Sequence, residues 1–113
     1  MATARAITVP AMPARKTWVE IKHDAAQNRP HVSSEHAYLR AKENDEVVWY
    51  SGSDRFTIIF QAGSPFTDEK FDVPRGGSVS SGPLREDVEV RTYKYSVKGV
   101  VGEPLDPDVI IRP

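Results

Sequence analysis

The sequence contains no cysteine, and this absence removes several classes of chemistry at once. Without thiols the chain can form no disulfide, no thiolate zinc site and no cysteine nucleophile. It also lacks any run of about 20 apolar residues, the length that a transmembrane helix requires. The 15 basic and 16 acidic residues are dispersed along the chain, and the formal net charge is −1. Because no block of one sign occurs, nothing supports a nucleic-acid partner or an anionic membrane.

The 113 residues suffice for one domain with a single core. We predict a flexible N-terminal arm over residues 1–15, because this stretch is rich in small residues and is interrupted by Pro10 and Pro13. One domain over residues 16–113 follows. The arm has no continuous apolar run typical of a signal peptide, so we expect a cytoplasmic protein, with an exported mature form as the alternative. Its "AITV" segment could add to a sheet edge.

Short alternating segments dominate the rest of the chain and predict strands. We expect "EVVWYS" and "FTIIFQ" to pair as a β-hairpin across the turn signal "GSD". "VEVRTYKYSVKGV" is the longest alternating run, with Tyr93, Tyr95 and Val97 on one face. The middle of "RGGSVSSGP" reads as a weak strand between loops. Strands about ten residues apart, separated by glycine and proline, favour a β-sandwich or barrel.

The segment "SSEHAYLRAKEND" is ambiguous between helix and strand over residues 35–43. Ser33 or Ser34 could cap a helix, and the residues that follow are good helix formers. As a strand, the segment would direct Ala37 and Leu39 toward the core. Local propensity favours the helix, whereas the neighbouring strands favour the strand.

Three stretches resemble the cupredoxin-like fold: "YLRAKENDEVVWYS", "FTIIFQAGSPF" and "RTYKYSV". With the ending "LDPDVIIRP", the chain is similar to small bacterial cupredoxin-like domains of unassigned function. The resemblance covers about two thirds of the chain and implies an all-β, Greek-key β-sandwich of about seven to eight strands. It also implies that residues 37–42 form a strand.

The resemblance does not extend to the blue-copper site. Such a centre needs two imidazoles and one thiolate, usually with a distant thioether. Val97 stands where copper-binding members carry cysteine, and Arg55 and Phe56 stand near the position of the first histidine. "KGVVGEP" holds no second histidine, and both methionines, Met1 and Met12, fall in the predicted arm. We therefore expect neither type 1 copper nor another cofactor.

The three histidines, His23, His31 and His36, lie within one short segment and could converge on a metal ion. Their spacings of eight and five match no recognised ligand pattern, so we do not assign them to a metal site.

Two further stretches have residues that are typical of ligand sites. The carboxylates Glu103, Asp106 and Asp108 could hold calcium, but "LDPD" is equally explained by turn formation. "RGGSVSSGP" is no phosphate loop, because Pro83 directly follows Gly82 where a lysine would be needed.

Among the aromatic residues, we expect Trp49 to lie in the core and Tyr50 to point to the opposite face. Trp18 shares its predicted face with Glu20 and Lys22, which indicates exposure. Trp18 is therefore our candidate contact residue, since tryptophan is enriched at binding surfaces.

No catalytic constellation or nucleophile motif occurs, so non-enzymatic function is favoured over an enzyme. We predict a non-catalytic binding or protein-interaction module. The alternative is a metal-binding or small-molecule-acting protein that uses the histidine-bearing N-terminal region. The sequence names no partner; a protein partner fits, and a homo-oligomer formed through the arm or a sheet edge is a further alternative.

Overall fold

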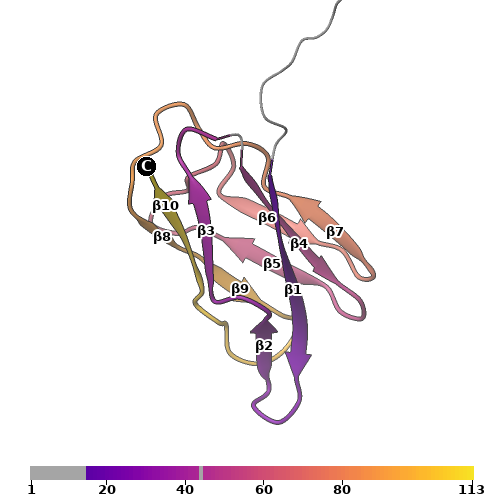
Figure 1. Cartoon of the computed structure of the whole chain (residues 1–113). Coiled ribbons are helices and arrows are strands. Elements are labelled where there is room, and N and C mark those ends of the chain that lie inside the picture. Colours follow the sequence, from indigo (N-terminus) through magenta and orange to yellow (C-terminus); the bar gives the residue numbers. More distant parts are fainter. Residues whose placement is uncertain (1–14, 44) are drawn as a thin grey trace, which may run out of the picture.

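The structure, a computed structural model, describes residues 15–43 and 45–113. These residues form strands and no helix (Figure 1). The predicted arm, with its "AITV" segment, lies outside the described residues apart from Arg15. The strands are β1 (Lys16–Asp24), β2 (Arg29–Val32), β3 (His36–Arg40), β4 (Glu46–Ser51), β5 (Phe56–Ile59), β6 (Lys70–Val73), β7 (Gly77–Ser80), β8 (Thr92–Lys94), β9 (Ser96–Lys98) and β10 (Asp108–Arg112).

A four-stranded sheet has the order β2-β1-β4-β7. β1 pairs antiparallel with β2, and β4 pairs antiparallel with β7, whereas β1 and β4 are parallel. Figure 1 shows β1 and β4 side by side near the middle of the molecule. Within the parallel pair, Trp18 lies opposite Val48 and Glu20 lies opposite Tyr50. This register decides which outward side chains of β1 and β4 meet.

Two three-stranded sheets have the orders β3-β10-β8 and β6-β5-β9. Only Tyr95 separates β8 from β9, so one run of chain contributes a strand to both sheets. The backbone N–H of Tyr95 donates to the carbonyl of Pro107 at 3.0 Å, and that of Val97 donates to Leu105 at 2.8 Å. Pro107 has no N–H with which to donate a hydrogen bond to the carbonyl of Tyr95. The regular strand pairing is therefore interrupted beside Tyr95, although the two segments remain in contact. The three sheets are consistent with a β-sandwich.

The core follows the predicted alternation. Tyr93, Tyr95 and Val97 are all buried, which confirms that they share one inward face. Trp49 is fully buried, and its ring centroid lies 5.2–6.4 Å from those of four other aromatic rings, those of Phe60, Phe66, Phe71 and Tyr95. Tilted and edge-to-face pairs of this kind each contribute about 0.5–1.5 kcal/mol beyond the area that they bury. The Trp49 indole N–H also donates to the Tyr95 hydroxyl at 3.3 Å.

The segment that was ambiguous between helix and strand is a strand. β3 pairs in parallel with β10, and Ala37 and Leu39 are buried on its inner face. The pairing with β10 satisfies the backbone of β3, so tertiary contacts override the local helix propensity. The middle of "RGGSVSSGP" is also a strand, β7, as predicted.

The predicted hairpin between "EVVWYS" and "FTIIFQ" is wrong. β4 pairs with β1 and β7, whereas β5 pairs with β6 and β9, so the turn between them leads from one sheet to another. Alternation identifies the inward residues of each strand but not the neighbour with which it pairs. The described strands also number ten rather than seven to eight, because the longest alternating run divides at Tyr95 and residues 29–32 form the additional strand β2.

Candidate functional site

The outward face of the four-stranded sheet carries an exposed aromatic pair. Because Val19 and Ile21 of β1 point into the core, Trp18, Glu20 and Lys22 point outward. The Trp18 side chain is 56% exposed, which confirms the prediction from the sequence.

The ring of Trp18 contacts Tyr50 of β4 edge to face, with centroids 5.9 Å apart and an interplanar angle of 72°. Val48, opposite Trp18 in the register, is only 5% exposed although it belongs to the same outward face. We call Trp18, Val48 and Tyr50 the aromatic face. Polar side chains from three strands surround it in the register: Lys16, Glu20, Glu46, Ser78 and Ser80.

From the sequence, Tyr50 was predicted to point away from the face of its strand that carries the buried Trp49. Its contact with Trp18 was not predicted. Tyr50 is half-buried, and its neighbour on β1 follows from the parallel β1–β4 pairing. The available signal was that both strands alternate, with an aromatic residue on the outward side of each. The register that joins them has no local signature.

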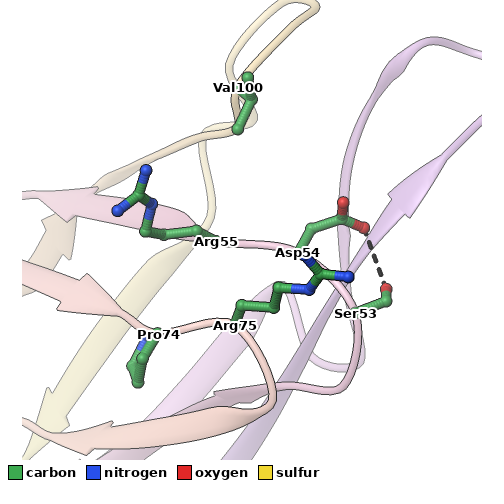
Figure 2. A pocket seen from close by; sticks show the side chains of 6 residues that line it. All are labelled: Ser53, Asp54, Arg55, Pro74, Arg75 and Val100. Carbon is green, nitrogen blue, oxygen red and sulfur yellow. Dashed lines mark hydrogen bonds between the residues drawn. The ribbon is translucent and has the colours of Figure 1, made fainter.

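A second surface feature is a hollow that is lined by three connections between strands (Figure 2). We call it the loop-end hollow. Its volume is about 510 Å³, and it is open to solvent. The lining comes from the β4–β5, β6–β7 and β9–β10 connections: Ser53, Asp54, Arg55, Pro74, Arg75 and Val100. A smaller hollow of about 80 Å³ adjoins it and shares Asp54 and Val100 with it.

Turn chemistry fixes the first two connections. The buried Ser51 hydroxyl accepts a hydrogen bond from the backbone N–H of Asp54 at 3.2 Å, and this bond closes the chain after β4. In the β6–β7 connection, the N–H of Gly77 donates to the carbonyl of Pro74 at 3.1 Å. Gly76 has a φ of 68°, a conformation that glycine adopts without steric cost.

The third connection rests against the β1–β2 turn. A Cβ added to Gly102, whose φ is 87°, would collide with the carbonyl oxygen of Asn28. The guanidinium of Arg29 donates to the carbonyl oxygen of Pro104 at 2.8 Å. These contacts hold the loop in place, and its side chain Val100 is 79% exposed beside the hollow.

The positions that the cupredoxin resemblance assigns to copper ligands carry other groups. Val97 is fully buried and pairs with Ile58 across β9 and β5. Phe56 is buried, whereas Arg55 is exposed and lines the loop-end hollow. An aliphatic, a phenyl and a guanidinium group offer no ligand to a copper ion.

The three histidines do not meet. His23 lines the small hollow, whereas His31 of β2 lies opposite Lys22 on the outward side. His36 belongs to β3, and its Nδ1 lies 2.7 Å from Oδ1 of Asp108. Among residues 15–43 and 45–113, no group of three or more histidine or acidic side chains is placed to hold a metal ion.

The C-terminal carboxylates also act separately. Glu103 is exposed, Asp106 accepts a hydrogen bond from the Ser96 hydroxyl at 3.2 Å, and Asp108 contacts His36. "LDPD" is not a turn, because Leu105 and Asp108 lie in extended chain opposite Val97 and Lys94. Asp106 and Asp108 instead have hydrogen-bond partners within the protein.

Tyr95 is the titratable group whose environment departs most clearly from water. Burial raises its pKa to about 12, against an opposing effect of the hydrogen bond from Trp49. Because Tyr95 lies in the core rather than at either surface feature, this shift concerns stability.

Comparison with known proteins adds no assignment: no protein-family model matches the chain, and no curated protein is significantly similar to it. Within the described part of the chain, no helix offers the length and apolar character of a membrane span.

Proposed function

We propose that the chain is a non-catalytic binding module that recognises a protein partner through the aromatic face. The observation that carries the proposal is the exposure of Trp18 beside Tyr50 on the outward side of the four-stranded sheet. Exposed aromatic groups ringed by polar side chains have the layout of a protein interface, with an apolar centre and a polar rim.

The proposal includes a copper-free, cupredoxin-like sandwich of Greek-key type as the scaffold. The order β2-β1-β4-β7 supports one layer, and the continuous run from β8 to β9 supports joining the two smaller sheets into a second. The parallel pairs β1–β4 and β3–β10 require long connections between sheets, as Greek-key chains have. The buried Val97 is in keeping with a fold that retains its packing without the metal.

Rigidity makes the aromatic face suited to recognition. Trp18 lies in the part of β1 that pairs with β4, over residues 16–20, so this pairing fixes its backbone before a partner arrives. Binding then orders few groups and loses little conformational entropy. Aromatic residues at the centre of an interface commonly account for about 2 kcal/mol or more of the binding free energy on truncation to alanine.

The test is quantitative capture of proteins from native cells on the immobilised full chain, comparing wild type, Trp18→Ser and Tyr38→Ser. Tyr38 is a matched control because it is an aromatic residue, 49% exposed, on β3 of another sheet. We expect at least one protein to be retained by wild type and Tyr38→Ser and lost by Trp18→Ser. A second copy of this chain would count as that partner. If Trp18→Ser retains every protein that wild type retains, the aromatic face is not the binding surface.

A further inference from the structure

We propose that the loop-end hollow binds a small organic oxyanion, in which a phosphate or carboxylate is attached to an apolar body. Arg55 and Arg75 would receive the anion, and Val100 and Pro74 would contact the apolar body. The hollow involves none of the residues of the aromatic face, so this inference stands independently of the proposed protein partner.

The two arginines of the hollow differ from most other arginines of the described chain in having no partner there. Neither guanidinium makes a hydrogen bond or an ion pair with any described residue. Five other arginines have a carboxylate, a carbonyl or an aromatic ring as partner: Arg29, Arg40, Arg85, Arg91 and Arg112. An unpaired guanidinium keeps its hydrogen-bond donors for a ligand, and its planar fork matches carboxylate and phosphate.

The strand register brings the two arginines together. Phe56 of β5 lies opposite Val73 of β6 in an antiparallel pair. Arg55 directly precedes β5, and Arg75 follows β6 by two residues, so both lie at the same end of this strand pair. Both side chains line the hollow, and Figure 2 shows them extending in different directions, so a ligand that spans the hollow would contact both guanidinium groups.

Asp54 sets the charge of the hollow. Its carboxylate accepts a hydrogen bond from the Ser53 hydroxyl at 3.0 Å (Figure 2). Figure 2 shows Arg75 extending toward the Asp54 side of the hollow, while Arg55 extends away from it. Two arginines and one aspartate give the hollow a net charge of +1, which attracts an anion. The carboxylate of Asp54 repels the anion and so weakens this attraction. Removing the carboxylate should therefore strengthen anion binding.

The shape of the hollow favours an organic anion over a bare ion. A volume of about 510 Å³ exceeds what a phosphate fills, and it falls within the roughly 300–1,000 Å³ of small-molecule sites. Val100, exposed at its rim, supplies an apolar surface that an inorganic anion leaves uncovered. Because the hollow is open to solvent, we expect a dissociation constant on the order of 1 mM.

The experiment is a titration of the full chain, uniformly labelled with ¹⁵N, followed by NMR amide shifts at low salt. The probes are phenyl phosphate, benzoate and inorganic phosphate. We expect shifts confined to residues 52–55, 74–77 and 99–101, with tighter binding of phenyl phosphate than of inorganic phosphate. The benzoate and phenyl phosphate arms distinguish a carboxylate from a phosphate as the preferred group.

Variants that change one charge each make the test decisive. Arg55→Gln and Arg75→Gln should each raise the dissociation constant of phenyl phosphate by about tenfold, as expected for loss of a charge-assisted hydrogen bond. Asp54→Asn should lower it by about threefold because it removes the opposing charge. Lys42→Gln is the control: it removes one positive charge before the start of β4, at the end of that strand away from the hollow, and should leave the constant within about twofold of wild type.

Two results would overturn the inference. One is a set of shifts spread over surface lysines and unchanged by Arg55→Gln and Arg75→Gln. The other is equal weakening by Lys42→Gln and by the arginine variants, which would mark a general charge effect. Trp18→Ser should bind phenyl phosphate as wild type does, so this test and the protein-capture test can fail separately.

Discussion

The two tryptophans occupy neighbouring strands of one sheet and have opposite environments. Trp49 of β4 is fully buried among aromatic rings, whereas Trp18 of β1 is 56% exposed. In the register, Trp49 lies opposite Val19, the residue that follows Trp18, so the alternation of side chains sends the two indoles to opposite faces. The same residue type thus serves packing in one place and leaves apolar surface available for contact in the other.

The largest expected effect on stability comes from replacing the buried Trp49. Trp49→Ala would leave a cavity among the rings of Phe60, Phe66, Phe71 and Tyr95. We expect it to lower the free energy of unfolding by about 3–5 kcal/mol, measured by urea denaturation. If the variant does not fold, Trp49→Phe supplies the graded case, with a smaller loss in the same direction. A loss below about 1 kcal/mol for Trp49→Ala would contradict the packing described for Trp49.

The buried hydroxyl of Tyr95, beside Trp49, should make the stability of the protein depend on pH. The pKa of Tyr95 is about 12 in the folded chain against an ordinary 10.0, because burial disfavours the phenolate. The folded state then holds the proton more tightly than the unfolded state. Stability from this group is complete below pH 10 and is lost as pH rises through 12. A shift of this size corresponds to roughly 2–3 kcal/mol.

Urea denaturation of wild type between pH 9 and 12 measures this loss, with Tyr95→Phe as the comparison. The variant should be less stable near neutral pH, because the indole N–H of Trp49 loses its acceptor, at a cost of about 1–3 kcal/mol. It should also lose less stability than wild type as pH rises. Equal slopes for the two proteins would show that Tyr95 does not supply the pH dependence.

A glycine substitution sharpens the comparison, because it disturbs the contact between two loops and involves neither indole. In Gly102→Ala the added methyl would meet the carbonyl of Asn28, in a backbone conformation that alanine rarely adopts. We expect a loss of about 1–3 kcal/mol in thermal or urea unfolding. Gly82→Ala is the matched control: its φ is also positive, at 73°, but nothing lies within 4 Å of the added methyl. Equal losses would mean that strain alone, and not the Asn28 contact, sets the cost.

The smallest expected effect on stability is at Trp18. Because much of its ring is already in water, Trp18→Ser should change the free energy of unfolding by no more than about 1 kcal/mol. The measurement is the urea midpoint with its slope, set beside that of Trp49→Ala. A loss comparable to that of Trp49→Ala would assign Trp18 to packing.

The alternation of residue types was enough to predict much of the fold. It identified an all-β chain, the inward face of Tyr93, Tyr95 and Val97, the burial of Trp49 and the exposure of Trp18. These predictions depend only on the period of two along each strand. The hairpin prediction failed because pairing partners depend on contacts between distant segments, and β4 finds its neighbours in β1 and β7.

The surface features were less accessible to sequence reasoning for the same reason. Tyr50 meets Trp18 through the parallel β1–β4 register, and Arg55 and Arg75 line one hollow because β5 and β6 pair. Neither pair is adjacent in the sequence, and neither belongs to a recognisable motif. The histidines illustrate the reverse case, since their closeness in the sequence suggested a site, whereas the strands carry them to different faces.

The central claim is that the outward indole of Trp18 serves contact and the inward indole of Trp49 serves stability. Its most direct test is the dissociation constant of the captured partner, measured by isothermal titration calorimetry with wild type and with folded Trp18→Ser. The account predicts that the constant rises by about 30-fold or more, while the urea midpoint stays close to that of wild type. An unchanged dissociation constant for Trp18→Ser would contradict it.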